Sequence, residues 1–162
     1  MLRDVVSGSE GGAPQIADRR LARRFADYWA RSKTGRFPSW VEMRQAPLGD
    51  DWDWAFVADV EKSIAVPYFE YMGAPLSALI DSQLCGDTDW IMSFLERASI
   101  DIFESIATEN THARDDSLSL VDGRQILLRS IVAPLADDGE RVTHVMGVVN
   151  GRVADKGRIV AV

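Results

Sequence analysis

The polar residues best placed to do chemistry interrupt the longest apolar stretch of the chain. That stretch runs from residue 126 to residue 149, ILLRSIVAPLADDGERVTHVMGVV, and it contains Arg129 and His144. A buried arginine needs an anionic partner, so Arg129 is a candidate for binding a small carboxylate. The alternative, which we favour, is an ion pair with an acidic side chain on a neighbouring strand.

His144 is a candidate for proton transfer, which requires a buried carboxylate within hydrogen-bond reach. Asp59 or Asp116 could provide that carboxylate, and the chain would then be a small α+β enzyme with a cone-shaped fold. The sequence contains no Ser-His-Asp signature, P-loop, GxGxxG or HExxH motif. His144 also alternates with Val142 and Met146 along one strand face, as a structural histidine does. We therefore favour a non-catalytic protein, with proton transfer as the alternative.

Residues that typically bind metals are scarce. Cys85 is the only cysteine, and His112 and His144 are the only histidines. Their spacing is not that of a structural zinc site, which takes four clustered Cys or His ligands. A single cysteine also rules out an intrachain disulfide and favours a reducing compartment. We expect no metal and a cytoplasmic location.

Aromatic residues form a second group of candidates. Several of them, from a strand and from a helical segment, could line an apolar pocket, although such residues more often fill a core. Together with the polar residues above, the candidate ligand-binding residues are Tyr68, Trp90, Phe94, Phe103, Arg129, His144 and Met146.

The composition is that of an ordinary globular protein, with 46% hydrophobic and 27% charged residues. At 162 residues the chain is expected to form one domain with its own core. The net charge of -7 argues against nucleic-acid binding, which usually needs a basic excess. No apolar run approaches the roughly 20 residues of a membrane helix. We therefore predict no nucleic-acid partner and no membrane insertion.

Hydrophobic periodicity divides the chain into four parts. Residues 1–17 are rich in Ser, Gly and Pro and are predicted to be a mobile tail. An amphipathic helix is predicted over 18–36, with Asp18 as its N-cap and its many Arg side chains on the solvated side. A folded domain is predicted over 37–154, and 155–162 is expected to be a frayed tail.

Within the folded domain, strands occupy the two ends and helices the middle. Strands are predicted in DWDWAFVADVEKS and VPYFEYMG, and helices follow between residues 74 and 110. Three more strands are predicted in RDDSLSLVDG, RQILLRSIVAPLADDG and RVTHVMGVVNGRV. The last two are apolar on both faces, so we expect them near the middle of the sheet. This order predicts an α+β domain with one antiparallel sheet and helices on one face.

Trp52 and Trp54 fall on one face of the first predicted strand, and that face needs a cover. The N-terminal helix can provide one, either within the chain or from a second subunit. We therefore interpret the apolar side of this helix and the sheet face as the contact of a homodimer. Its candidate residues are Leu21, Phe25, Tyr28, Trp29 and Trp54.

The order of elements and four stretches of sequence resemble the PAS superfamily, and in particular a bacterial family of stand-alone PAS-like proteins. The four stretches are FADYWARSKTGRFPSW, PYFEYMGAPLSAL, DGRQILLRSIVAPLADDG and VTHVMGVVNGRV. The resemblance implies a five-stranded antiparallel sheet in spatial order 2-1-5-4-3, with helices closing over one face. It also implies a non-catalytic sensory or signalling module, often a homodimer, that acts through contacts with a partner protein.

The resemblance also bears on cofactors. PAS domains that form a flavin adduct carry an Asn-Cys-Arg-Phe type of motif, whereas residues 83–86 of this chain read QLCG around Cys85. PAS domains that bind haem usually hold it through a histidine on the long helix, and neither His112 nor His144 lies there. We therefore expect neither flavin nor haem, and the identity of any ligand is left open.

Overall fold

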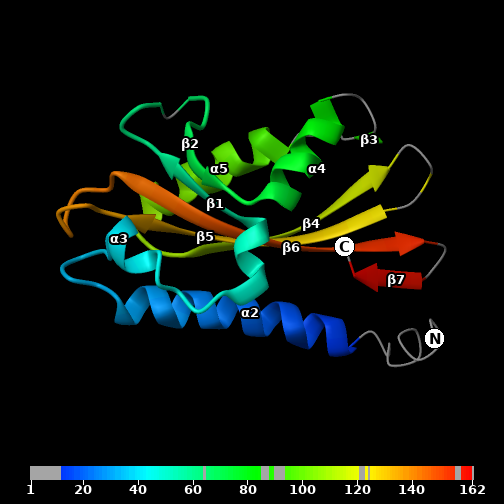
Figure 1. Cartoon of the computed structure of the whole chain (residues 1–162), viewed down its shortest axis with the longest axis horizontal. Helices are drawn as coiled ribbons and strands as arrows, with labels where there is room; N and C mark the ends of the chain where they lie inside the picture. The colour runs from blue at the N-terminus through cyan, green and yellow to red at the C-terminus, as the bar shows by residue number, and fades with distance from the viewer. Residues whose placement is uncertain are drawn as a thin grey trace.

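The structure, a computed structural model shown in Figure 1, describes residues 12–63, 65–84, 88–89, 94–120, 123, 125–155 and 158–161. Its helices are α2 (Gly12–Arg31), α3 (Trp40–Met43), the 3-10 helix η1 (Gly49–Trp54), α4 (Ala74–Leu84) and α5 (Phe94–Thr108). Its strands are β1 (Ala55–Asp59), β2 (Phe69–Met72), β3 (Thr88–Asp89), β4 (His112–Leu120), β5 (Gln125–Leu135), β6 (His144–Asp155) and β7 (Arg158–Ala161). The predictions for residues 1–11, Cys85 and Trp90 lie outside the described residues.

The described strands form one antiparallel sheet in the order β2-β1-β6-β5-β4-β3, and β7 pairs with β6. The strands β2, β1, β6, β5 and β4 follow the order 2-1-5-4-3, so the predicted PAS-like topology is confirmed. The short strand β3 extends the sheet beside β4. The region predicted to be a frayed tail contains β7, which pairs with the last residues of β6.

The hairpin of β5 and β6 lies at the centre of the sheet because both strands are apolar on both faces. β6 pairs with β1 on one side and with β5 on the other, and its Val145 and Met146 are fully buried. In the turn of this hairpin, Gly139 has a φ of 82°, a left-handed conformation that glycine adopts without steric cost. The Asp138 carboxylate accepts hydrogen bonds from the backbone N–H groups of residues 140 and 141, which closes the turn.

Helices cover both faces of the sheet (Figure 1). On one face, α4 and α5 form a core with Phe56 of β1 and Val145 of β6. On the other face, α2 and α3 form a core with Val57 of β1 and Met146 of β6. Successive strand residues point to opposite faces, so one strand contributes to both cores. All five residues of β1 are therefore buried.

The helix α2 is held on the sheet by its amphipathic sequence. Leu21, Phe25 and Trp29 recur at a spacing of four residues and are buried, whereas Arg23 on the opposite side is 85% exposed. The indole Nε1 of Trp29 donates a hydrogen bond of 2.8 Å to the carbonyl oxygen of Pro134 in β5. The sheet is thus covered within the chain, as one of the two alternatives predicted.

The bounds of α2 differ from the predicted helix over 18–36. The helix begins at Gly12 and ends at Arg31, so Asp18 lies inside it and is not its N-cap. The prediction of a mobile tail was wrong for residues 12–17, which belong to α2 although no apolar periodicity precedes Asp18. None of the helices in the described part of the chain is long and apolar enough to span a membrane.

Trp52 and Trp54 lie in η1, because β1 begins only at Ala55. Trp52 packs against the core under α2, and Trp54 packs against the core under α5. The prediction that they share one sheet face was therefore wrong. Alternating Asp and Trp residues suit a short 3-10 helix as well as a strand, and here Gly49 begins that helix with a φ of 55°.

Candidate functional site

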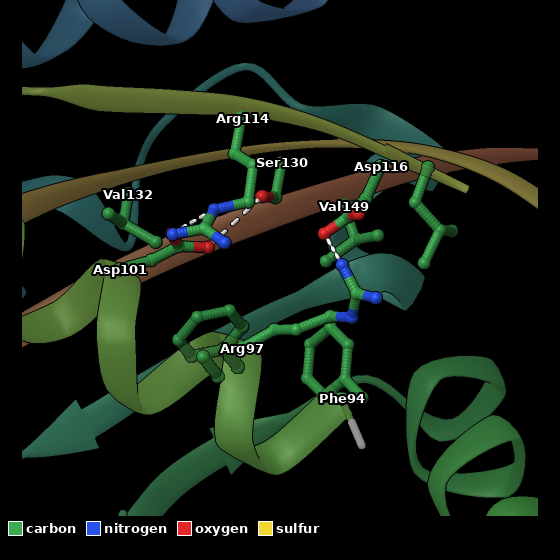
Figure 2. A pocket seen from close by; sticks show the side chains of 11 residues that line it. Phe94, Arg97, Asp101, Arg114, Asp116, Ser130, Val132 and Val149 are labelled. Atoms are coloured by element: carbon green, nitrogen blue, oxygen red, sulfur yellow. Dashed lines mark hydrogen bonds and ion pairs between the residues drawn. The ribbon is translucent and has the colours of Figure 1, made fainter. Parts of the chain in front are cut away.

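A small cavity lies between α5 and the sheet (Figure 2). Its volume of about 20 Å³ is room for about one water molecule. Apolar residues from β1, α5, β5 and β6 form part of its wall. The polar part of its wall consists of Arg97, Asp101, Arg114, Asp116 and Ser130.

Two ion pairs connect α5 to β4 across this cavity. Figure 2 shows Arg97 and Asp101 reaching from α5 toward Asp116 and Arg114, which lie in β4. The Nε atom of Arg114 lies 2.7 Å from Oδ1 of Asp101. Ser130 of β5 donates a longer hydrogen bond of 3.4 Å to the other oxygen of Asp101. Helix and sheet are therefore joined here by charged groups and not only by apolar packing.

The local sequence explains why these side chains meet. Phe94, Ala98 and Ile102 recur every four residues and define the buried side of α5, and Asp101 falls on the same side. In β4, Arg114 and Asp116 are two residues apart, so they point to the same face of the sheet. The charged residues of α5 and β4 thus face each other across the cavity.

Burial sets the electrostatics of this site. The pKa of the Asp101 carboxyl is raised above its ordinary value, because burial disfavours the charged form more than Arg114 and His112 stabilise it. Burial and the nearby charge of Arg114 lower the pKa of the Arg97 guanidinium. Asp101 Oδ1 and Asp116 Oδ2 are buried without a partner in hydrogen-bond geometry among the described residues. Attraction to the two arginines is therefore what offsets their burial.

An open groove lies on the other side of the sheet, beside α3. It has a volume of about 460 Å³ and is lined by Trp40, Arg44, Trp52, Glu70 and Tyr71. The three aromatic rings are in mutual contact, with centroids 5.7 to 6.3 Å apart. The guanidinium of Arg44 lies over the Trp40 ring, 5.0 Å from its centroid. This groove has an aromatic floor with one basic and one acidic side chain at its sides.

His144 lies next to this groove and is surrounded by acidic side chains. Its Nε2 atom is 2.8 Å from Oε2 of Glu70 and 3.9 Å from Oδ2 of Asp59. Its Nδ1 atom is 2.8 Å from Oγ1 of Thr143 and 3.6 Å from Oδ1 of Asp137. The side chain of His144 is buried, and neither the cavity under α5 nor the groove is lined by it. The predicted proximity of His144 to Asp59 is present, whereas Asp116 lies at the other site.

Those predicted ligand-binding residues that the structure describes do not form one pocket. Phe94 lines the cavity under α5. Phe103 is 48% exposed, because the buried side of α5 runs through positions 98 and 102. Tyr68 is 46% exposed and its ring lies under the ammonium group of Lys62 at the surface. Met146 is fully buried on the opposite face of the sheet, in the core under α2.

Arg129 is paired with an acidic residue of the neighbouring strand, which is the alternative that we favoured. Its Nε and Nη2 atoms contact the two carboxylate oxygens of Asp115 in β4, the latter at 2.7 Å. Asp115 is directly opposite Arg129 in the sheet. Because β5 directs Leu128 and Ser130 toward the cavity under α5, Arg129 between them points to the other face.

The predicted dimer contact is occupied within the chain. Leu21, Phe25 and Trp29 are buried against the chain's own sheet, and the Tyr28 hydroxyl donates to the carbonyl oxygen of Glu42 at 3.4 Å. Trp54, the fifth predicted residue, packs on the opposite face, under α5. These side chains therefore do not share one surface.

Comparisons with known proteins found similarity of structure only. No family model matches the chain, and no curated protein matches it. The LOV domain of the blue-light photoreceptor Aureochrome1, in its dark state, is 16% identical with a TM-score of 0.44, covering 63% of this chain and 77% of that one. The N-terminal domain of a diguanylate cyclase with a PAS/PAC sensor from Marinobacter aquaeolei is 16% identical with a TM-score of 0.38, covering 59% and 90%.

A third solved structure, the LOV domain of a blue-light activated histidine kinase from Erythrobacter litoralis, is 13% identical with a TM-score of 0.41, covering 60% of this chain and 93% of that one. At these identities the likeness concerns the fold alone. The order of the described strands, 2-1-5-4-3 with the last long strand beside the first, is the arrangement of PAS domains. On that order, this chain has a PAS-like α+β fold.

Proposed function

We propose that the chain is a non-catalytic PAS-like sensory module, in which a small anionic molecule moves α5 and the change reaches a partner protein. The observation that supports this is the cavity under α5, which has room for about one water molecule and is lined by the Arg97–Asp116 and Asp101–Arg114 ion pairs. A larger molecule can enter only if α5 moves away from the sheet. Binding and movement are then linked, as a sensor requires.

The charges of the cavity indicate the class of ligand. Guanidinium groups bind carboxylates through paired, charge-assisted hydrogen bonds. A small carboxylate would compete with Asp101 and Asp116 for Arg97 and Arg114. In this proposal these two arginines replace Arg129 as the ligand-binding cations, because Arg129 points to the other face of the sheet.

The output of the module is, in this proposal, a contact with a partner protein or with a second copy in the cytoplasm. The single cysteine supports a reducing compartment. The apolar side of α2 is occupied by the chain's own sheet, so a homodimer would use another surface. The outer side of α5 is where a movement of this helix reaches solvent, and Ile100 and Phe103 are exposed there.

Proton transfer by His144 is the alternative, and the geometry supports it less. A general base needs access to a substrate proton. His144 lies beside Glu70 and Asp59, but its Nε2 atom is buried and the described cavities do not reach it. The groove reaches only Glu70, so a substrate would have to displace that side chain first.

Hydrogen exchange on the full chain tests the sensory proposal. Acetate, succinate and citrate serve as probes, each titrated into the untagged protein. We expect at least one probe to change amide exchange in residues 94–108 while residues 21–31 of α2 stay unchanged. The Arg129→Met variant keeps this response, because its ion pair lies on the other face.

The same titration shows what would contradict the proposal. If amide exchange in α5 is unchanged by all three carboxylates, at concentrations up to the millimolar range, the proposal that a small anion binds in this cavity is excluded. A response that is equal in α2 and α5 would point to a general stabilisation by salt and not to the cavity. Isothermal titration calorimetry then separates binding at one site from such a general effect.

A further inference from the structure

Three ionisable side chains from neighbouring strands meet beside the aromatic groove. Asp59 ends β1, Glu70 lies in β2, and His144 begins β6, directly opposite Asp59 in the sheet. One potential ligand atom of each residue lies within 4.8 Å of the other two. We infer that Asp59, Glu70 and His144 form a binding site for a divalent transition-metal ion of the Zn²⁺ type. This inference does not rest on the proposed function, because the two sites lie on opposite faces of the sheet.

A β-bulge aims Glu70 at this site. Tyr71 pairs with Val57, but Phe69 pairs with Ala58, so Glu70 is an extra residue without a cross-strand partner. A bulge of this kind changes the direction of a side chain and is often found next to functional sites. As a result, Glu70 and Tyr71, which follow each other in the sequence, both line the groove.

One of the two nitrogens of the buried imidazole lacks a hydrogen-bond partner among the residues that the structure describes. The Nε2 atom of His144 has no partner in hydrogen-bond geometry among the described residues, although two carboxylates lie close to it. The side chain is only 8% exposed. When Nδ1 donates its proton to Oγ1 of Thr143, 2.8 Å away, the lone pair of Nε2 lies close to two negative charges. That arrangement requires a cation between them, either a proton on Nε2 or a metal ion.

The surroundings hold the ligands in place, as they do in known metal sites. Oδ1 of Asp59 accepts hydrogen bonds of 3.0 Å from the backbone N–H groups of Glu61 and Lys62, which leaves Oδ2 directed at His144. Oγ1 of Thr143 accepts a hydrogen bond from the backbone N–H of residue 137 while it contacts Nδ1 of His144. Two of the three ligands are therefore oriented before any ion binds.

The donor set and the distances indicate the kind of ion. One imidazole nitrogen and two carboxylate oxygens suit Zn²⁺ and similar transition ions better than Mg²⁺, and two carboxylates neutralise a divalent charge. Ligand atoms about 2.0–2.1 Å from a tetrahedral zinc lie about 3.3 Å from one another. The separations of 2.8 and 3.9 Å from Nε2 to Glu70 and Asp59 lie on either side of that value. Glu70 is 38% exposed, so its movement opens the way in from the groove.

Calorimetry with Zn²⁺ on the untagged, chelator-treated full chain tests the site. The experiment uses a Cys85→Ser background, so that the only thiol does not compete for zinc. We expect one Zn²⁺ per chain, with affinity reduced at least about tenfold by Glu70→Gln or His144→Gln. Glu61→Gln and His112→Gln are the matched controls and should bind as the parent does, because Glu61 pairs with Arg141 and His112 lies beside Asp101.

The location of the ion is measured separately with Co²⁺, a paramagnetic substitute for Zn²⁺. It should broaden the backbone NMR signals of residues 59, 70 and 144 and leave those of α5 sharp. Because Glu70 is partly exposed, Glu70→Gln should remain folded even if His144→Gln does not. Equal affinity in the parent and Glu70→Gln proteins, or no Zn²⁺ binding below the millimolar range, would overturn the inference and leave a proton on Nε2 as the cation.

Discussion

Arg114 of β4 and Asp101 of α5 form an ion pair, with 2.7 Å between Nε of the arginine and Oδ1 of the aspartate. The Asp101 side chain is only 5% exposed, whereas Arg114 is 28% exposed. The carboxylate therefore loses more hydration on folding than the guanidinium does. A buried ion pair of this kind contributes little net stability, but removing one partner is costly because the other is left as an uncompensated charge.

Replacing Arg114 by Met is expected to destabilise the protein by about 3 kcal/mol at neutral pH, near the lower end of the range for breaking a buried ion pair. The loss stays at that end because His112 Nε2 remains 3.5 Å from the Asp101 carboxylate. Urea unfolding followed by circular dichroism measures the change. A second substitution, Asp101→Asn, removes the stranded charge and should restore more than half of the loss.

Arg129→Met is the matched control for that prediction. Its partner Asp115 is 68% exposed, so this ion pair is solvated and its loss should cost less than about 1 kcal/mol. If Arg114→Met and Arg129→Met destabilise the protein equally, the ion pair under α5 does not hold the helix to the sheet as we conclude.

The stability of the protein should depend on pH through Asp101. Burial raises its pKa in the folded chain above the ordinary value of 3.8, so the folded state keeps this proton over a pH range in which the unfolded chain has released it. The stabilisation that this proton provides is therefore fully present below pH 3.8. It is lost as the pH rises through the pKa that Asp101 has in the folded protein. Relative to Asp101→Asn, the wild type should become less stable as the pH increases.

Unfolding free energies of the wild type and Asp101→Asn between about pH 3.5 and 5.5 measure this dependence. The difference between the two proteins isolates Asp101, because all other carboxylates are common to both. A wild type that gains stability over Asp101→Asn with rising pH would mean that attraction to Arg114 outweighs burial and would contradict the prediction.

Gly147 is required where β6 crosses the core under α5. A Cβ atom at this position would lie 2.4 Å from the Phe56 ring and 3.0 Å from Cγ1 of Val132. Phe56 is fully buried and cannot move freely, so Gly147→Ala should cost about 1–3 kcal/mol through overpacking. Thermal unfolding measures the loss. The double variant with Phe56→Leu should be more stable than the sum of the two single changes predicts, and strict additivity would contradict the proposed clash.

The central part of the fold could be predicted because its signal is local. The two apolar runs around a short turn indicate the hairpin of β5 and β6, and the four-residue spacing of apolar residues indicates the helix α5. Trp52 and Trp54 could not be placed in the same way, because alternating Asp and Trp residues fit both a strand and a 3-10 helix. The 3-10 helix is held by contacts with distant residues, such as the hydrogen bond of 2.9 Å from the Tyr71 hydroxyl to the Trp52 carbonyl oxygen.

The sites were predicted less well because they depend on pairs of distant residues. Arg129 and His144 stood out as polar residues in an apolar hairpin, and the pairing of His144 with Asp59 was among the alternatives. Glu70 was missed, because the bulge that directs it cannot be read from the sequence. Asp101 was also missed, although a signal existed: an aspartate on the apolar side of a helix needs a partner.

The hydrogen bond from Trp29 to Pro134 joins α2 to the centre of the sheet. Trp29→Phe removes the donor, leaves a buried carbonyl oxygen without a partner and reduces the packed volume. The combined cost should be about 2–4 kcal/mol, measured by urea unfolding. Tyr28→Phe is the control, since its hydroxyl makes only a long hydrogen bond of 3.4 Å, and its cost should stay below about 1 kcal/mol. Equal losses of stability in the two variants would mean that α2 is held on the sheet by the burial of apolar surface alone. The hydrogen bond of the Trp29 indole would then not determine the position of the helix.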